Sequence, residues 1–241
     1  MSTHPTGQQW LQEATVSEAV YALRPDYRAL LVLAEDLQPG PSDASSEALL
    51  AAAEQQAATA LAGGRPEDLA PLAAWRETYR AFGAKPQRTR PSVEALVRRV
   101  EAGLPRIDRI TDTYNAISVS HLMPLGGEDA DRYDGPPRLV RADGSEQFHT
   151  GAGGEPVVEH PEVGEVVWAD AAGVTCRRWN WRQCTRTQIA QETTRALFIL
   201  DSLQDVQPLE DLHAAAAQLQ TALAAFSPRA TFATRLLGPT G

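Results

Sequence analysis

The sequence predicts an α+β fold, with helices concentrated in the first half of the chain and strands in the second. Two alanine- and leucine-rich stretches with helical spacing lie before residue 85. Most of the short apolar runs bounded by glycine, proline or aspartate lie after residue 120. Strands and helices do not alternate regularly, as they would in a parallel α/β sheet, so the order of elements indicates an α+β protein.

The chain has 241 residues, of which 43% are hydrophobic and 22% charged, an ordinary globular composition. It shows no internal repeat and no linker, so we expect a single domain over residues 16–228 with flexible ends at 1–15 and 229–241. No run approaches the ~20 apolar residues that span a bilayer, and the N-terminus lacks the pattern of a signal peptide. We therefore expect a cytoplasmic protein that does not contact membranes.

The first elements are predicted from apolar runs and their boundaries. A continuous apolar run over Tyr27–Ala34 indicates a buried strand that ends before Pro39. Capping residues and glycines then delimit helices over 47–62 and 66–82, and a third helix begins at Pro91 and ends near Gly103.

Later elements are mostly strands. The stretch Ala116-Ile-Ser-Val-Ser120 alternates apolar and hydroxyl side chains, so we expect a half-buried strand there after a short helical or turn opening. An acidic residue and a glycine, Asp170 and Gly173, indicate the turn of a hairpin between 163–169 and 173–181. The remaining predicted elements are strands at 138–141, 156–159 and 194–200 and an amphipathic helix at 209–226.

The formal net charge of −9 argues against a general nucleic-acid binder, because basic residues supply most of the sequence-independent affinity for phosphates. We expect no DNA binding and only local RNA contacts. Lys85 is the only lysine among 22 basic residues. Arginine favours bidentate contacts to phosphate or carboxylate, although genomic base composition explains the same bias.

Metal and cofactor chemistry have no local signature in this sequence. Cys176 and Cys184 are too few for a disulfide scaffold and are not spaced as a metal knuckle. The five histidines show no HxxxH or HxH pairing. We therefore predict neither a metal site nor a cofactor.

A segment rich in arginine and tryptophan, Cys176-Arg-Arg-Trp-Asn-Trp-Arg-Gln183, is the strongest candidate for RNA contact. In a strand, Arg178 and Arg182 share one face, and they would repel each other unless an anion or carboxylate lies between them. Arginines beside indoles suit phosphate contacts and base stacking, so Arg178, Trp181 and Arg182 are candidate RNA-binding residues. Alternatively, the tryptophans cap the core and the arginines pair with Glu165 and Asp170.

Three groups of motifs follow one another along the chain. They are Tyr79-Arg-Ala-Phe-Gly-Ala-Lys-Pro86 with 90–99; Leu104-Pro-Arg-Ile107 with Asp112-Thr-Tyr-Asn-Ala-Ile-Ser118; and Pro124-Leu-Gly-Gly-Glu-Asp129 with 164–170 and 176–183. In this order they resemble the B3/B4 domain of the phenylalanyl-tRNA synthetase β subunit, as carried by freestanding proteins. The likeness covers roughly Tyr27 to Asp201. The resemblance implies an α+β unit whose cleft admits the 3′ end of tRNA and hydrolyses a wrongly attached tyrosine.

The chain also departs from the synthetase pattern at two positions. The synthetase has a histidine just after a proline, where this chain has Pro124-Leu-Gly126-Gly127. The acidic residue that reads the tyrosine hydroxyl would fall within 197–201, where the equivalent position is apolar. The resemblance therefore implies a trans-acting aminoacyl-tRNA deacylase, or a derivative that acts on an aminoacyl or amino-acid-like ligand, without support for tyrosine specificity. The alternative is a non-catalytic module that binds tRNA 3′ ends or an amino-acid-like metabolite.

Asn115 matches the asparagine that the synthetase places in its editing cleft, and it is the candidate catalytic residue. With Tyr114 and Ser118 beside it, its amide could hold the α-amino group or the ester carbonyl of an aminoacyl adenosine. Equally, Asn115 could satisfy backbone groups at a turn. Because no Ser-His-Asp or Cys-His set has local support, water positioned by polar groups is the expected nucleophile.

The tract from Pro124 to Asp129 supplies the other candidate ligand-binding residues. Gly126 and Gly127 would let backbone N–H groups approach a ligand closely, and Glu128 and Asp129 would offer carboxylates to an amine. A plain acidic turn explains the tract as well.

Overall fold

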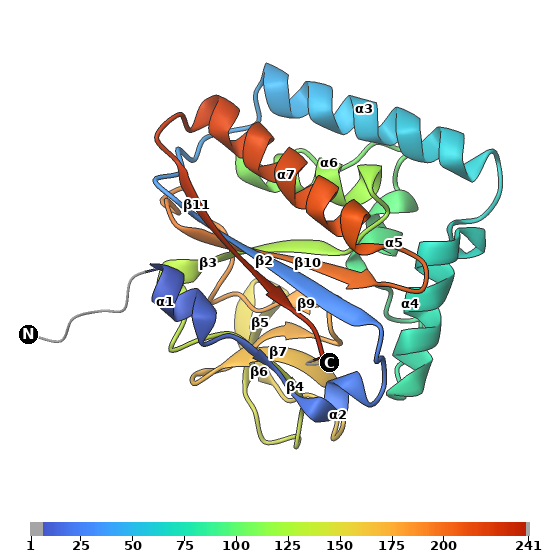
Figure 1. The fold of residues 1–241 in the computed structure, drawn as a ribbon, viewed down its shortest axis with the longest axis vertical. Helices are drawn as coiled ribbons and strands as arrows, with labels where there is room; N and C mark the ends of the chain where they lie inside the picture. Colours follow the sequence, from blue (N-terminus) through green and yellow to red (C-terminus); the bar gives the residue numbers. More distant parts are fainter. Residues whose placement is uncertain (1–6, 240–241) are drawn as a thin grey trace, which may run out of the picture.

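The structure is a computed structural model that describes residues 7–239 (Figure 1). A four-stranded antiparallel sheet lies at its centre, and a five-stranded sheet packs against one face of it. In spatial order, the four-stranded sheet is β11 (Thr231–Leu237), β2 (Tyr27–Glu35), β10 (Ala196–Leu203) and β3 (Leu125–Asp129). The five-stranded sheet is β1 (Thr15–Val16), β4 (Arg138–Arg141), β7 (Val166–Asp170), β8 (Gly173–Arg177) and β9 (Arg182–Gln183). A hairpin of β5 (Phe148–Ala152) and β6 (Glu155–Glu159) adjoins it.

Helices cover the other face of the four-stranded sheet. Two of them, α6 (Arg109–Ser120) and α7 (Leu209–Phe226), pack directly on the sheet, and α3 (Ala44–Leu61) forms an outer layer over α6 (Figure 1). The remaining helical segments are α1 (Gly7–Gln12), α2 (Glu18–Tyr21), α4 (Ala70–Ala81), α5 (Ser92–Val97) and the 3₁₀ turns η1 (Pro66–Asp68) and η2 (Ala130–Arg132). The predicted α+β class is confirmed. Within residues 7–239, none of the helices has the length and apolarity that crossing a bilayer requires.

The central strand β2 shows why its sequence is apolar without interruption. Leu31 and Leu33 face the five-stranded sheet, while Leu30 and Val32 face α6 and α7. Successive side chains of a strand point to opposite faces, and both faces of β2 are buried in packed layers. The predicted strand at 27–34 is therefore confirmed, together with the helices expected at 47–62, 66–82 and 209–226.

The strand expected at 116–120 is wrong, because these residues form the second half of α6. Asp108 begins this helix by accepting hydrogen bonds from the backbone N–H groups of Ile110 and Thr111, at 2.9 and 2.8 Å. The helix lies between the sheet and α3, so Ile117 packs toward the sheet while Ala116 and Val119 pack toward α3 and α5. Burial on both sides of one helix thus produced the apolar pattern.

The extended strand expected over 173–181 is also wrong beyond residue 177. Arg178 and Trp179 adopt left-handed backbone conformations, with φ of 47° and 68°, and these residues turn the chain out of β8. The backbone N–H of Trp181 then bonds to the carbonyl of Arg177 at 3.0 Å. Strand pairing resumes only at β9, so residues 177–183 do not share two faces in the predicted alternation.

The segments expected to be flexible contain regular structure in the described residues. In α1, Trp10 and Leu11 are buried in the core between the two sheets. At the other end, β11 pairs antiparallel with β2 over seven residues, from Thr231 to Leu237. The packed structure therefore extends beyond the predicted boundaries of 16 and 228. The predictions for residues 1–6 and 240–241 lie outside the described residues.

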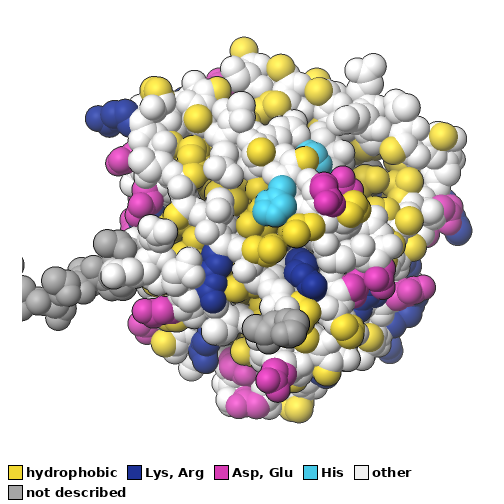
Figure 2. Space-filling model, viewed as in Figure 1, with side chains coloured by type: hydrophobic (Ala, Val, Ile, Leu, Met, Phe, Trp, Pro, Cys, Tyr) yellow, Lys and Arg dark blue, Asp and Glu magenta, His cyan; other side chains and the backbone are white. Residues whose placement is uncertain are grey.

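Charge is unevenly distributed over the surface. On the face shown in Figure 2, uncharged and apolar side chains dominate the upper region, where α3 and α7 lie in the same view of Figure 1. This follows from the alanine- and glutamine-rich sequences of the two helices. A polyanion would find few cations there, because phosphate binding depends on basic side chains.

Candidate functional site

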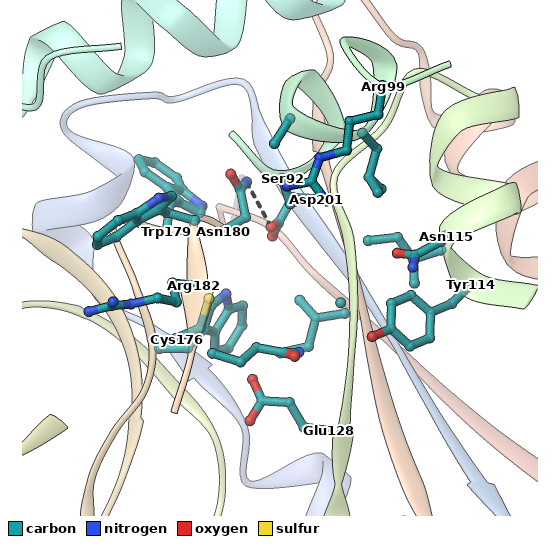
Figure 3. A pocket seen from close by; sticks show the side chains of 18 residues that line it. Ser92, Arg99, Tyr114, Asn115, Glu128, Cys176, Trp179, Asn180, Arg182 and Asp201 are labelled. Carbon is teal, nitrogen blue, oxygen red and sulfur yellow. Dashed lines mark hydrogen bonds between the residues drawn. The ribbon is translucent and has the colours of Figure 1, made fainter. Parts of the chain in front are cut away.

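A cavity of about 230 Å³ opens between the two sheets and the helices α5 and α6 (Figure 3). Tyr114 and Asn115 of α6 form one side of it, and β3 contributes Gly126 and Glu128. The opposite side consists of residues of the five-stranded sheet and of the loop between β8 and β9. The cavity therefore lies where the helical layer and both sheets meet.

A buried carboxyl, Asp201 of β10, lies on the cavity wall. It accepts a hydrogen bond from the hydroxyl of Tyr27 at 2.6 Å and one from Nδ2 of Asn180 at 3.0 Å (Figure 3). The hydroxyl of Tyr79 in turn donates to Oδ1 of Asn180 at 2.9 Å. Burial raises the pKa of Asp201 to about 7, although the two hydrogen bonds lower it. Both protonation states of this carboxyl are therefore populated near neutral pH.

A second buried carboxyl, Glu128, lies on another part of the wall. It is only 1% exposed, and its Oε2 atom accepts hydrogen bonds from Tyr133 at 2.7 Å and from Thr187 at 2.8 Å. Burial raises the pKa of Glu128, and the hydroxyl donors lower it. The carboxyl that the sequence predicted for this tract therefore reaches the cavity, as a deep group and not as part of an exposed acidic turn.

Asn115 projects from α6 beside Tyr114, across the cavity from Trp179 and Arg182 in Figure 3. The residue is 8% exposed, and its side-chain amide has no hydrogen-bond partner among residues 7–239. It does not bond to a turn, which was the alternative role suggested by the sequence. Its amide therefore keeps a donor and an acceptor that a ligand or water in the cavity could bind.

The tryptophan-rich side of the cavity is built by the left-handed turn at Arg178 and Trp179. Trp179 packs edge-on against Tyr27 and Trp75, with ring centroids 4.9 and 5.6 Å apart. Trp168 and Trp181 also lie on the wall. This arrangement gives the cavity an apolar side opposite the amide of Asn115.

Both predicted RNA-binding arginines are paired with glutamates. Arg178 lies 3.6 Å from Glu165, and Arg182 lies 2.8 Å from Glu159. Both guanidinium groups also stack near the ring of Trp181, at 4.5 and 4.7 Å from its centroid. Carboxylates thus supply the neutralisation that the sequence analysis expected from an anion or a carboxylate, and Arg178 does not line the cavity in the described part of the chain.

Other predicted site residues support the fold instead of lining the cavity. Ser118 is fully buried and donates to the carbonyl of Met123 at 2.6 Å. Asp129 accepts hydrogen bonds from the hydroxyl of Thr193 and from the backbone N–H of Asp131 in η2. Gly127 provides close packing, because an added Cβ would lie 2.9 Å from Tyr114, Phe198 and Ile189.

Sequence reasoning missed several polar residues of the wall, among them Ser92, Arg99, Asn180 and Asp201. Asp201 had a local signal, since it is an acidic residue within an otherwise apolar strand whose eight residues are all buried. The other three come from α5, from the turn after it and from the loop after β8, and no spacing in the sequence links them. Within residues 7–239, the structure contains no group of three or more His, Cys, Asp or Glu side chains that could hold a metal ion.

The fold and the cavity define an α+β domain with a partly open, partly polar cavity. The sequence profile of the B3/4 domain matches residues 74–211, more than half of the chain, so the protein belongs to the B3/4 domain family. Among solved structures, it is similar to an N-terminal fragment of the phenylalanyl-tRNA synthetase β subunit from Pyrococcus horikoshii, with a TM-score of 0.44 and 13% identity. The match covers 93% of this chain and 50% of that fragment, so the chain spans about half the length of its structural relative. No curated protein matches.

Proposed function

We propose that the cavity binds the aminoacyl group at the 3′ end of a tRNA and that the protein hydrolyses the ester bond in trans. Membership of the B3/4 family and the resemblance of residues 79–183 to an editing domain support this proposal. The observation that carries it is the free, buried amide of Asn115, which faces a cavity that also contains the carboxyls of Asp201 and Glu128.

In the proposed reaction, the amide N–H of Asn115 donates to the ester carbonyl. Water adds to the carbonyl carbon, the bond to the ribose oxygen breaks, and the proton of the water passes to that oxygen. Negative charge develops on the carbonyl oxygen in the transition state, so a preorganised donor accelerates the step. The products are a free amino acid and an uncharged tRNA.

The attacking group in this proposal is water and not a protein thiol. Cys176 lies on the cavity wall, but burial raises the pKa of its thiol well above the ordinary value. The reactive form of cysteine is the thiolate, which is scarce under these conditions. Among the carboxyls of the wall, an ionised Asp201 is the candidate to accept a proton from water. Its pKa of about 7 matches the requirement for a general base at neutral pH.

A second candidate function is ligand binding without hydrolysis, and Gly126 favours it. The tract from Pro124 to Gly127 lacks the histidine of the related synthetase pattern. At Gly126, Nε2 of Gln183 lies 3.0 Å from the position of an added Cβ. The same Gln183 amide donates to the carbonyl of Gly127 at 2.8 Å. An amide cannot transfer protons as an imidazole does, so this part of the cavity is better suited to binding than to acid–base chemistry.

A deacylation panel distinguishes the two functions. Purified protein is incubated with tRNAs that carry different labelled amino acids, and release is followed under single-turnover conditions. We expect hydrolysis of at least one ester and a loss of about 10²-fold or more in rate for Asn115→Ala, the usual effect of removing an oxyanion donor. Ser120→Ala is the control, because Ser120 lies on the same helix but lines a separate groove beside α3.

The outcomes separate clearly. Binding of charged tRNA without hydrolysis, with affinity reduced by Asn115→Ala, would leave only the binding function. Neither binding nor hydrolysis with any tRNA would refute both functions. Circular dichroism spectra of the variants show whether the fold is retained.

A further inference from the structure

Arg99 is held at the cavity by the turn that follows α5. Its backbone N–H bonds to the carbonyl of Leu96 at 2.8 Å, and its own carbonyl accepts from the N–H of Ala102 at 2.9 Å. The side chain lies on the cavity wall with that of Ser92, and Figure 3 shows its guanidinium group extending toward Ser92 and Asp201. A fixed backbone thus presents a cation to the cavity.

This guanidinium group has no anionic partner in the part of the chain that the structure describes. Across residues 7–239, Arg99 makes no side-chain hydrogen bond and no ion pair, and the hydroxyl of Ser92 is also without a hydrogen bond. Arg182, the other arginine on the wall, is paired with Glu159 at 2.8 Å. Arg99 is therefore the cavity cation that remains available to a ligand.

The electrostatic surroundings strengthen this assignment. Residues 83–100 contain five basic residues and one acid, Glu94, in a chain whose net charge is −9. Glu94 is already contacted by Arg76 at 2.7 Å, Arg98 at 2.9 Å and Arg90 at 3.6 Å. Arg98 also pairs with Glu67, so these three arginines share two carboxylates. Positive charge is therefore in excess beside Arg99, and an anion bound there would be stabilised.

We propose that Arg99, together with Ser92, is the anion-binding residue of the cavity. The ligand group is an oxyanion that accepts charge-assisted hydrogen bonds from the guanidinium group: a phosphate next to the 3′ nucleoside of an RNA, or the carboxylate of a free amino acid. This inference rests on the proposed function and names the ligand group that fixes the orientation of the substrate. It also assigns the phosphate contact to Arg99, in place of Arg178 and Arg182, which were predicted from the sequence.

Three probes without a hydrolysable ester test the inference by isothermal titration calorimetry. The first is an RNA oligonucleotide ending in CCA with an amide-linked amino acid at its 3′ end. The second is the corresponding 3′-aminoacylamido adenosine, which has no phosphate, and the third is the free amino acid. Each is titrated into wild-type protein and into Arg99→Gln, Arg99→Lys, Arg88→Gln and Arg229→Gln.

The control variants remove the same charge in other places. Arg88 belongs to the same basic segment but does not line the cavity, and Arg229 lies between α7 and β11. If the oxyanion is a phosphate, we expect Arg99→Gln to weaken the oligonucleotide by about tenfold or more and to leave the adenosine probe unchanged. If it is a carboxylate, only binding of the free amino acid weakens. Arg99→Lys should restore part of the affinity, because it keeps the charge but not the bidentate geometry.

The inference is overturned if Arg99→Gln binds every probe as tightly as Arg229→Gln does. Equal weakening by Arg88→Gln and Arg99→Gln would overturn it too, because that result indicates diffuse attraction by the segment. If wild-type protein binds none of the probes, the proposed function fails and takes this inference with it. Retained binding of the adenosine probe in Arg99→Gln shows that the cavity remains folded.

Discussion

Asn180 donates a hydrogen bond from Nδ2 to Oδ2 of Asp201 at 3.0 Å, and this contact joins the loop after β8 to strand β10 (Figure 3). Asn180 lies in the loop between two strands of the five-stranded sheet, whereas Asp201 belongs to the four-stranded sheet, and both residues are buried. Tyr27 and Tyr79 complete the network by donating to Asp201 and Asn180. The cavity wall at this point is thus a satisfied polar network whose only titrating carboxyl is Asp201.

Asp201→Asn should change how stability depends on pH. The ordinary pKa of 3.8 rises to about 7 in the folded protein, so between about pH 4 and 7 the folded state retains a proton that the unfolded state has released. The free energy of unfolding contributed by Asp201 therefore falls as pH rises through this window, by up to about 4 kcal/mol, and levels off above pH 7.

Urea denaturation of the wild type and of Asp201→Asn across pH 4–8 measures this effect. We expect the variant to gain stability relative to the wild type as pH rises. Glu128 also has a raised pKa, but it is present in both proteins and cancels in the comparison. A difference that stays constant with pH would show that Asp201 titrates normally.

Tyr27→Phe should raise the pKa of Asp201 further. The Tyr27 hydroxyl donates to Oδ1 at 2.6 Å, and a donor stabilises the ionised carboxylate. Titration of the Asp201 carboxyl carbon by NMR provides the measurement. Tyr21→Phe is the matched control, since Tyr21 contacts the ring of Tyr27 at 6.4 Å between centroids but makes no hydrogen bond to Asp201. Identical titration curves in all three proteins would contradict the prediction.

Arg177 and Glu165 should form the most stabilising ion pair near the cavity. Arg177 makes two parallel hydrogen bonds to Glu165, at 2.9 and 2.8 Å, and both side chains are buried. Removing Glu165 leaves the buried Arg177 with Glu159, at 2.8 Å, as its remaining partner. Glu165→Ala should therefore cost about 3 kcal/mol in unfolding free energy, the lower end of the range for a broken buried pair. Glu192→Ala is the control, because its pair with Arg132 is exposed and should contribute about 1 kcal/mol or less. Equal losses in the two variants would refute the distinction.

Gly127→Ala should destabilise the cavity wall. The added Cβ would lie 2.9 Å from side-chain atoms of Tyr114, Phe198 and Ile189, so these must shift. Overpacking of this kind typically costs about 1–3 kcal/mol. The control is Gly151→Ala in β5, where the nearest atom is 3.7 Å away. Chemical denaturation of both variants provides the comparison, and a Gly127→Ala variant as stable as the wild type would show that the wall adapts freely.

Local sequence patterns predicted much of the fold because they reflect local physical requirements. The uninterrupted apolar run of β2 is the pattern of a strand buried on both faces, and the residues flanking α3 cap and end a helix. The pattern at 116–120 failed because a helix packed on two sides resembles an alternating strand. The regular structure near the two ends has no local signal in the sequence, because it depends on distant partners: β11 is paired with β2.

The site was predicted only in part. Asn115, Tyr114 and Glu128 do lie together on the cavity wall, and so do Gly126, Trp181 and Arg182. Arg178 was predicted from a strand geometry that two left-handed residues interrupt, and Glu165 neutralises it. Ser118, Gly127 and Asp129 have the expected residue types, but their bonds and contacts serve packing and capping.

The sequence by itself determined the α+β class, the family and the segment that carries the cavity asparagine. Only the tertiary structure decided which polar groups share the cavity, because Arg99, Asn180 and Asp201 come from three separate elements. It also decided their charge states, since the pKa of Asp201 depends on burial between two sheets. Within the described residues, Arg99 is left without a carboxylate partner because Glu94 pairs with Arg90 and Arg98 instead. Residue types and helical or strand periods are local properties, whereas desolvation and charge pairing arise only when distant segments meet.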